Sequence, residues 1–228
     1  GDGTDMFSHF CREKNDTGDY YSHQEITDHV LFLLFAAHDT TTSALTMAMQ
    51  LLAEHQDWQT ELRDTIGRIE TDIPTFDQLG RNIPLLDYTF KEVLRLYPPV
   101  PGLIRRTIKP CEIGGYEVPA HTMVGTSISA NHHLPEYWHE PFKFDPMRFS
   151  ESRAEHKQHK FLWAPFGGGG HKCIGLHFAD MLFKSVLLNL LKTHRVQFAD
   201  SKQASGKILY VPFTRPKDNL PLVLISER

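Results

Sequence analysis

Apolar residues recur at helical spacing along much of the chain. Ser22-His23-Gln24-Glu25 spells a capping box, and the pattern after it predicts one long helix over residues 22–54. Further helices are expected over residues 57–69, from Pro84 to the Pro98-Pro99 pair, and over residues 174–193. The apolar positions of the last helix that are expected to face the core are Phe178, Leu182, Val186 and Leu190.

Short runs of β-branched and aromatic residues, bounded by Gly, Pro and polar residues, follow Pro99 and return near the C-terminus. Such runs predict strands. The expected strands cover residues 103–108, a hairpin over 112–118, and then 122–129, 195–199, 208–211 and 220–225. A second capping box, Thr75-Phe76-Asp77-Gln78, predicts a short helix. A helical turn is expected over residues 131–138, and residues 150–160 are expected to be polar and exposed.

The segment with the strongest chemical signal is Phe166-Gly167-Gly168-Gly169-Gly170-His171-Lys172-Cys173-Ile174-Gly175. Its glycines allow positive φ values and a close approach to a flat ligand. The helix that follows directs free N–H groups and its positive dipole end toward the sulfur, which favours the thiolate. A thiolate held in this way can be the axial ligand of a haem iron. A buried, inert cysteine at a helix start is the alternative that this segment alone leaves open.

Two phosphate-binding loops were compared with this segment, and neither fits. A Walker loop needs Gly before its Lys and Ser or Thr after it, whereas Lys172 lies between His171 and Cys173. A dinucleotide-binding fingerprint needs a third Gly where this segment has other residues. A zinc site is also disfavoured, because the chain has no Cys pair at zinc spacing and His171, Cys173 and His177 would form an incomplete set.

Two further segments carry weaker signals. In Ala36-Ala37-His38-Asp39-Thr40-Thr41-Thr42, the threonine side chains can bond back to helix carbonyls and open the turn, or the segment can be a mildly unfavourable piece of core helix. Glu92 and Arg95 share a helix face, and taken alone they are an ordinary surface ion pair that contributes ~0.2–0.5 kcal/mol.

Composition limits the class of protein. The chain has 228 residues, of which 40% are hydrophobic, so it can bury a sizeable core. A formal net charge of −4 argues against nucleic acid as a partner. The widely spaced Cys11, Cys111 and Cys173 fit a reducing compartment without disulfides. The longest apolar run, residues 30–37, is too short to span a bilayer, and no signal peptide opens the chain, so a cytoplasmic location is favoured.

The pattern Phe166-x-x-Gly169-x-His171-x-Cys173-x-Gly175 resembles the haem-binding signature of the cytochrome P-450 superfamily. Residues 36–41 resemble its oxygen-activation pattern, with Ala37 in place of the usual glycine. Glu92-x-x-Arg95 lies between these two segments, as in the family. Asp145-Pro146-Met147-Arg148-Phe149 resembles its Pro-Glu-Arg-Phe element, with Met147 in place of Glu. Four motifs in this order identify the chain as a member of the superfamily.

The resemblance implies a fold and a set of residue roles. The fold class is mainly α (α+β), a P-450-like helical fold with small β-sheets. Because members are longer, residues 1–228 are expected to be the C-terminal part of a single haem domain, with any membrane anchor upstream. Cys173 would be the metal ligand of haem b, Phe166 would shield it, and His171 and Arg105 would bind the propionates. The other implied residues are Gly167 and Gly175 at the cofactor, Glu92, Arg95 and Arg148 as a structural triad, Asp39 and Thr40 as the proton-delivery pair, and Phe32, Phe35, Ala36, Val100 and Leu103 along the substrate.

The resemblance also implies a reaction, the insertion of one oxygen atom from O2 into a lipophilic substrate. Electrons would come from a ferredoxin or a flavoprotein reductase, and the lysines expected to flank its docking surface are Lys157, Lys160, Lys172 and Lys184. A non-catalytic haem protein or an inactive fragment is one alternative. A haem-thiolate isomerase or peroxygenase is another, although such enzymes usually alter the pair that Asp39 and Thr40 form here.

Overall fold

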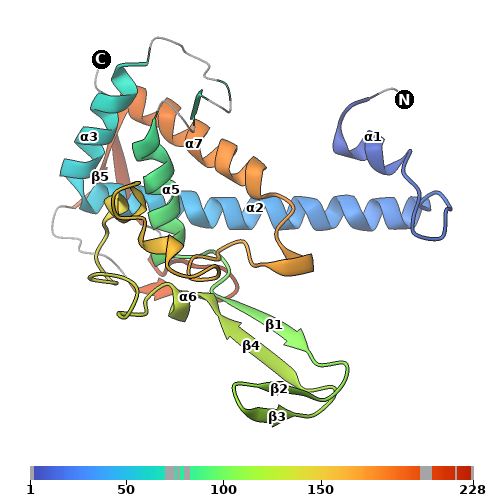
Figure 1. Ribbon diagram of the computed structural model, residues 1–228. Helices are drawn as coiled ribbons and strands as arrows, with labels where there is room; N and C mark the ends of the chain where they lie inside the picture. The colour runs from blue at the N-terminus through green and yellow to red at the C-terminus, as the bar shows by residue number, and fades with distance from the viewer. Residues whose placement is uncertain are drawn as a thin grey trace. The chain divides into compact units, whose positions relative to one another are not determined.

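The computed structural model describes residues 3–69, 75, 78–79, 83–200, 207–218 and 220–226, and helices are its main elements (Figure 1). The chain divides into two compact units, Gly1–Thr40 and Thr41–Arg228. The interpretation of residues 1–228 as part of one haem domain stays a prediction.

The first unit contains α1 (Met6–Phe10) and the beginning of α2 (His23–Glu54). The capping box predicted at Ser22 is present. The Ser22 N–H donates to Glu25 Oε2 at 2.8 Å, and the Glu25 N–H donates to Ser22 Oγ at 3.3 Å. Because each side chain satisfies a backbone donor that the first turn leaves unpaired, α2 begins where the sequence predicts, and it also ends at the predicted residue.

Helix α2 has a second property that the short apolar run at residues 30–37 did not reveal. By length and composition alone it is long and apolar enough to cross a membrane, with a mean hydropathy of 1.2 over an 18-residue window of which 17% is buried. Core helices of soluble proteins pass the same test, so this observation does not assign α2 to a membrane.

The core of the second unit lies where the last turns of α2 meet α3 (Gln56–Gly67), α5 (Pro84–Leu96) and α7 (Leu176–Thr193). Its side chains are apolar and almost fully buried. They include Met47, Ala48, Leu51 and Leu52 of α2, Leu62 and Ile66 of α3, Leu86, Phe90 and Val93 of α5, and Phe183, Leu187, Leu188 and Leu191 of α7. Close packing of these four helices therefore fixes α5 and α7 relative to each other.

The prediction of which face of α7 is buried was wrong. Phe178 is 54% exposed, and Leu182, Val186 and Leu190 are half-buried. The buried row is the adjacent one, in which Phe183 packs against Phe90 of α5 with ring centroids 4.9 Å apart. Since α7 is apolar on more than one face, its spacing identifies a helix but does not determine which face contacts the core.

Within the described residues, the strands form four two-stranded antiparallel ladders. They pair β1 (Gly102–Arg106) with β4 (Met123–Ser127), β2 (Cys111–Ile113) with β3 (Tyr116–Val118), β5 (His194–Phe198) with β8 (Leu222–Ser226), and β6 (Ile208–Leu209) with β7 (Arg215–Pro216). Figure 1 shows the β2–β3 hairpin at the far end of the β1–β4 ladder. The strands predicted from the sequence are confirmed with ends that differ from the expected ones by at most two residues, whereas β7 was not predicted.

Short helical segments connect these ladders to the helices. The predicted strand over residues 122–129 ends early, because the Ser127 side chain accepts a hydrogen bond from Ala130 N at 3.1 Å and starts α6 (Ile128–Asn131). Three 3-10 turns follow, η1 (Pro146–Phe149), η2 (Glu155–Lys157) and η3 (Gly169–His171). At Thr75 the predicted capping box is present, with Thr75 N donating to Gln78 Oε1 at 2.8 Å. Residues 76 and 77 of that short helix lie outside the described residues.

Candidate functional site

Residues 166–175, which we call the cysteine loop, close on themselves through backbone hydrogen bonds. Cys173 N donates to Phe166 O at 2.9 Å, and Lys172 N donates to Gly169 O at 3.2 Å. Gly167 and Gly169 have φ values of +70° and +68°, in the left-handed region that favours glycine. The glycines therefore permit a tight loop that holds the backbone of Cys173 just before α7.

Cys173 itself is exposed, so the alternative interpretation as a buried, inert cysteine is wrong. Gly175 is the N-cap of α7, and its carbonyl accepts the first helical hydrogen bond from Ala179 N at 2.8 Å. The first turn of α7 leaves unpaired N–H groups at this end of the helix, and Cys173 Sγ lies 3.8 Å from the position of a Cβ built on Gly175. Next to the thiol, Ile174 exposes 81% of its surface. An accessible thiol beside an exposed apolar side chain fits a flat, apolar ligand with a metal that prefers thiolate, as haem iron does.

Aromatic side chains fix the start of the cysteine loop to α5. Phe166 makes an edge contact with Trp163, with ring centroids 6.3 Å apart, and lies 6.2 Å from the ring of Phe90. The Trp163 indole N–H donates to Lys91 O at 3.1 Å, so the indole is held by packing and by a hydrogen bond. Phe161 packs on the loop itself, since a Cβ added at Gly168 would come within 2.9 Å of its ring.

The other predicted cofactor and substrate residues of the second unit lie on β1, just before it, or in the cysteine loop. Leu103 is half-buried and touches the loop, because its Cδ1 would lie 3.4 Å from a Cβ placed on Gly167. Val100, just before β1, is also half-buried. Arg105 and His171 are exposed, and the Arg105 guanidinium donates to Ile104 O at 2.8 Å. The structure thus brings Leu103 to the cysteine loop, and the propionate role of the two cations stays a prediction.

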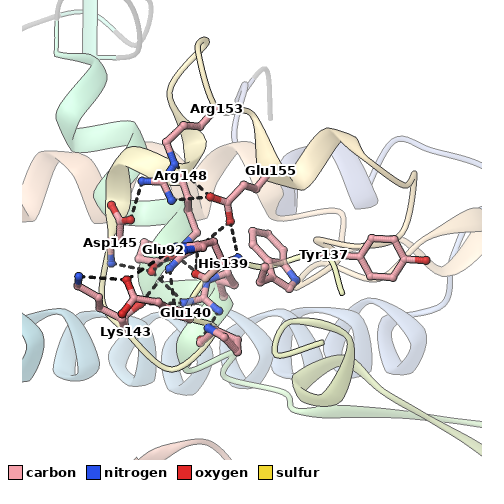
Figure 2. A network of polar contacts seen from close by, with 12 residues as sticks. Glu92, Tyr137, His139, Glu140, Lys143, Asp145, Arg148, Arg153 and Glu155 are labelled. Carbon is pink, nitrogen blue, oxygen red and sulfur yellow. Dashed lines mark hydrogen bonds and ion pairs between the residues drawn. The ribbon is translucent and has the colours of Figure 1, made fainter. Parts of the chain in front are cut away.

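The predicted triad forms a buried ion-pair cluster, of which Figure 2 labels Glu92 and Arg148. Arg95 is bidentate on Glu92, with N···O distances of 2.7 Å and 2.9 Å, and Arg148 Nε donates to Glu92 Oε1 at 3.1 Å. All three side chains are fully buried. Burial raises the pKa of Glu92, and the two guanidinium groups oppose that rise. Both carboxylate oxygens accept from N–H donors, as those of an ionised carboxylate do.

A fourth member of this cluster, Glu155, was missed by the sequence analysis, which expected residues 150–160 to be exposed. Glu155 is only 9% exposed, and its Oε2 accepts from Arg148 Nη1 at 2.7 Å (Figure 2). Its other oxygen accepts from Arg153 Nε at 3.1 Å, and Arg153 also donates to Asp145 at 2.6 Å. Burial raises the pKa of Glu155, but its hydrogen bonds and the charges of both arginines lower it below the usual glutamate range. No local sequence pattern marks this residue.

The negative charge of Glu155 makes the buried ion-pair cluster electrically neutral. Arg95 and Arg148 are two fully buried cations, and Glu92 supplies one negative charge. Glu155 supplies the second, so the innermost four side chains are neutral together. A buried guanidinium without a matching carboxylate is strongly unfavourable, which is why this fourth contact matters for the segment that leads into the cysteine loop.

The prediction that Lys184 flanks a docking surface was wrong. Lys184 is 2% exposed, because it lies on the face of α7 toward α5 and pairs with Asp87 and Asp180, each at 2.7 Å. Lys157, Lys160 and Lys172 are exposed, as expected.

A cavity of about 240 Å³ lies beside the cysteine loop, between Lys160, Phe161, Gly168, Lys172 and Leu176.

The predicted proton-delivery pair and three substrate residues lie in the first unit. The Thr40 hydroxyl donates to Ala36 O at 2.7 Å, the backward bond that the sequence suggested, yet α2 continues through residues 36–42 without interruption. The carboxylate oxygen Oδ1 of Asp39 lies 2.8 Å from His38 Nδ1, within hydrogen-bond distance. Phe32 and Phe35 are 65% and 59% exposed, and Ala36 is half-buried. Their roles stay predictions.

Comparison with known proteins extends these observations. The chain is 38% identical over 225 residues to "Putative cytochrome P450 136" of Mycobacterium tuberculosis, in an alignment that covers 97% of this chain and 45% of that protein. It is 29% identical over 204 residues to thromboxane-A synthase of Mus musculus, covering 89% of this chain and 38% of the relative. The chain thus spans about half or less of the length of these relatives.

Solved structures and a family model agree with these relatives. The structure of retinoic-acid-bound cyanobacterial CYP120A1 superposes with a TM-score of 0.90 at 32% identity, covering 98% of this chain and 51% of that one. This confirms the expected mainly α fold with small sheets. The cytochrome P450 family model matches residues 2–217. Since that match covers nearly the whole chain, the chain belongs to the cytochrome P450 family.

Proposed function

We propose that the protein containing this chain is a haem-thiolate monooxygenase, which inserts one oxygen atom from O2 into a lipophilic organic substrate with electrons from a redox partner. The single observation that carries this proposal is the exposed Cys173 thiol, held by a closed loop in front of α7. We further propose that residues 1–228 form the C-terminal part of one haem domain on the cytoplasmic side of the cell.

Haem b, when bound, would supply the iron at which O2 is reduced. Cys173 would be the metal ligand, with its backbone fixed by the hydrogen bond to Phe166 O. Phe166, held by Trp163 and Phe90, would exclude water from one side of the sulfur. Gly167 and Gly175 would allow the backbone to approach the macrocycle, since neither carries a side chain that would fill the space.

Charged and apolar side chains would place the cofactor and the substrate. His171 and Arg105, both exposed, would donate to the propionates. Val100 and Leu103 would contact the substrate, whose lipophilic character follows from such apolar side chains. Phe32, Phe35 and Ala36 are the other residues that we propose for substrate contact. Glu92, Arg95 and Arg148 would keep the surroundings of the loop in place. Asp39 and Thr40 would hold and transfer protons.

A ferredoxin or a flavoprotein reductase would supply the electrons. Its docking surface would include Lys157, Lys160 and Lys172, which are exposed near or within the cysteine loop, but not the buried Lys184. Opposite charges on the donor would increase the rate of encounter more than the final affinity.

A haem-thiolate isomerase is the second candidate, and the similarity to thromboxane-A synthase is the observation that favours it. The presence of both Asp39 and Thr40 favours the monooxygenase, because an isomerase needs no delivery of protons to reduced oxygen. The two candidates differ in their need for electrons, so consumption of a reduced donor during turnover separates them.

The ligand assignment is tested by replacing Cys173 with Ser in the haem-loaded protein. The ferrous carbon monoxide complex of the unchanged protein should absorb where thiolate-ligated haem does, and Cys173→Ser should abolish that band. Cys111→Ser is the matched control, since Cys111 is also an exposed, free thiol but lies on β2. An unchanged band in the Cys173 variant would reject the assignment.

A further inference from the structure

His132 is a buried histidine that none of the proposed roles uses. It follows α6, its side chain is fully buried, and both of its ring nitrogens lie within hydrogen-bond distance of backbone atoms. Nδ1 lies 3.1 Å from the carbonyl oxygen of Arg95, at the end of α5. Nε2 lies 3.0 Å from the backbone nitrogen of Ala164, which precedes the cysteine loop. One side chain therefore joins two segments that are far apart in the sequence.

The partners determine the protonation of the ring. Ala164 N–H can only donate, so Nε2 must accept and carry no proton. The carbonyl of Arg95 can only accept, so Nδ1 must carry the proton and donate. The imidazole is therefore neutral, with one defined tautomer. Burial, with the nearby charge of Arg95, lowers the pKa of His132 to about 3, which agrees with a neutral ring at ordinary pH.

Arg95 and His132 bind each other in both directions. The Arg95 guanidinium donates to His132 O at 2.8 Å, while the His132 ring donates to Arg95 O. Arg95 is also bidentate on Glu92. His132 thus receives its position from the buried ion-pair cluster, which leaves it little freedom to move.

A series of hydrogen bonds leads from His132 to the backbone of Cys173. Ala164 N donates to His132, Gly167 N donates to Ala164 O at 2.9 Å, and Cys173 N donates to Phe166 O at 2.9 Å. Each bond fixes the segment that makes the next one. A change at Ala164 therefore alters the place at which the loop starts and, with it, the backbone of Cys173.

We propose that neutral His132 is a positioning residue, which connects the end of α5 to the cysteine loop and thereby holds the backbone of Cys173 where its sulfur can ligate the iron. This inference rests on the proposed function, because it assigns His132 a part in haem ligation. Its structural half, the restraint on Ala164, does not depend on haem chemistry.

Two amide side chains can separate the two hydrogen bonds. The Gln amide reaches the position of Nε2, so His132→Gln keeps an acceptor for Ala164. The Asn amide reaches the position of Nδ1, so His132→Asn keeps the donor to Arg95 O but loses the acceptor. His132→Phe keeps the ring and loses both bonds. His133→Phe is the matched control, since His133 is the next residue, is half-buried, and contacts Ser129 O at 2.7 Å rather than Ala164.

The measurements use the haem-loaded protein that contains this chain. Amide hydrogen exchange at Ala164, Gly167 and Cys173 should accelerate by roughly five- to a hundredfold in His132→Asn and His132→Phe, because leaving a backbone donor without its partner costs about that factor. The same variants should lower the fraction of the carbon monoxide complex that absorbs at the thiolate band. His132→Gln and His133→Phe should resemble the unchanged protein in both measurements.

Equal behaviour of His132→Gln and His132→Asn would overturn the proposal, because only the first retains the acceptor for Ala164. This comparison stands even if His132→Phe fails to fold. Accelerated exchange with an unchanged thiolate band would also overturn it, since His132 would then be an ordinary core residue. Loss of the thiolate band in Cys173→Ser, together with either outcome, would leave the proposed function intact.

Discussion

Replacing Glu155 with Gln removes one of the two negative charges in the buried cluster and keeps the shape of the side chain. Arg95 and Arg148 remain as two cations with no exposed side-chain surface, and Glu92 alone faces them. The variant thus leaves a buried positive charge without a partner. The Gln amide can still accept from Arg148, but it cannot neutralise the guanidinium.

The expected loss is large compared with ordinary surface substitutions. Breaking a buried ion pair by removing one partner costs ~3–5 kcal/mol. The Glu155 side chain keeps 11% of its surface exposed, so partial solvation places the estimate near the smaller of these values, about 3 kcal/mol. A typical domain has ~5–15 kcal/mol of stability in all. The variant should therefore fold, with a clearly reduced free energy of unfolding.

Urea unfolding followed by circular dichroism measures this loss. Glu151→Gln is the control, because Glu151 is an exposed residue of the same segment and its substitution should change stability by at most about 0.5 kcal/mol. Equal unfolding free energies for the two variants would refute the argument that Glu155 neutralises a buried cation.

The pH dependence provides a second, independent measurement. The pKa of Glu155 is lowered in the folded protein, so below the ordinary value of 4.5 the unfolded chain binds the proton first. The stability that Glu155 contributes is therefore present above pH 4.5 and is lost as the pH falls through the lower, folded value. The difference between the unchanged protein and Glu155→Gln should shrink over that range. A constant difference would contradict the ionised state assigned to Glu155.

Three further predictions concern protons and charge. Thr40→Ala should divert electrons to hydrogen peroxide and lower the amount of product formed per electron, because general acid catalysis typically contributes ~10²–10⁴-fold. The yield is measured with the protein's own electron donor, and an unchanged yield would show that Thr40 is only a structural residue of the helix. Lys172→Glu should slow reduction by an acidic donor and flatten its salt dependence, while Lys109→Glu on the β1–β2 connection should not; equal rates would place the donor elsewhere. Because burial, with the charge of Arg95, lowers the pKa of His132 from 6.5 to about 3 on folding, the free energy of unfolding should decrease by about 1.6 kcal/mol from pH 6.5 to pH 5, and His132→Gln should lack that slope.

Local signals in the sequence predicted the elements well, because they depend on residues three or four positions apart. The capping box at Ser22 fixed the start of α2, and the pairing of Glu92 with Arg95 follows from their spacing on one helix. The glycines of the cysteine loop likewise report a backbone requirement that is purely local, as the positive φ of Gly167 and Gly169 illustrates.

Contacts between distant segments could not be predicted in the same way. Glu155 is buried because Arg148 lies opposite it, and His132 is neutral because Ala164 and Arg95 present a donor and an acceptor. Lys184 is buried by its position on the inner face of α7, where Asp87 of α5 compensates its charge. In each case the tertiary fold determines the partner, whereas the polarity of the residue alone suggests that it is exposed.

The four consecutive glycines of the cysteine loop differ in how well they tolerate substitution during evolution. Gly167 and Gly169 need a left-handed backbone, so most side chains would strain them. A Cβ at Gly168 would press on the ring of Phe161, which is 46% exposed and has room to turn away. At Gly170 no described atom lies within 4 Å of an added Cβ, and the backbone does not require positive φ. Gly170 is therefore the position at which natural variation can enter the loop without disturbing Cys173, and relatives that differ there are expected to keep the same ligand geometry.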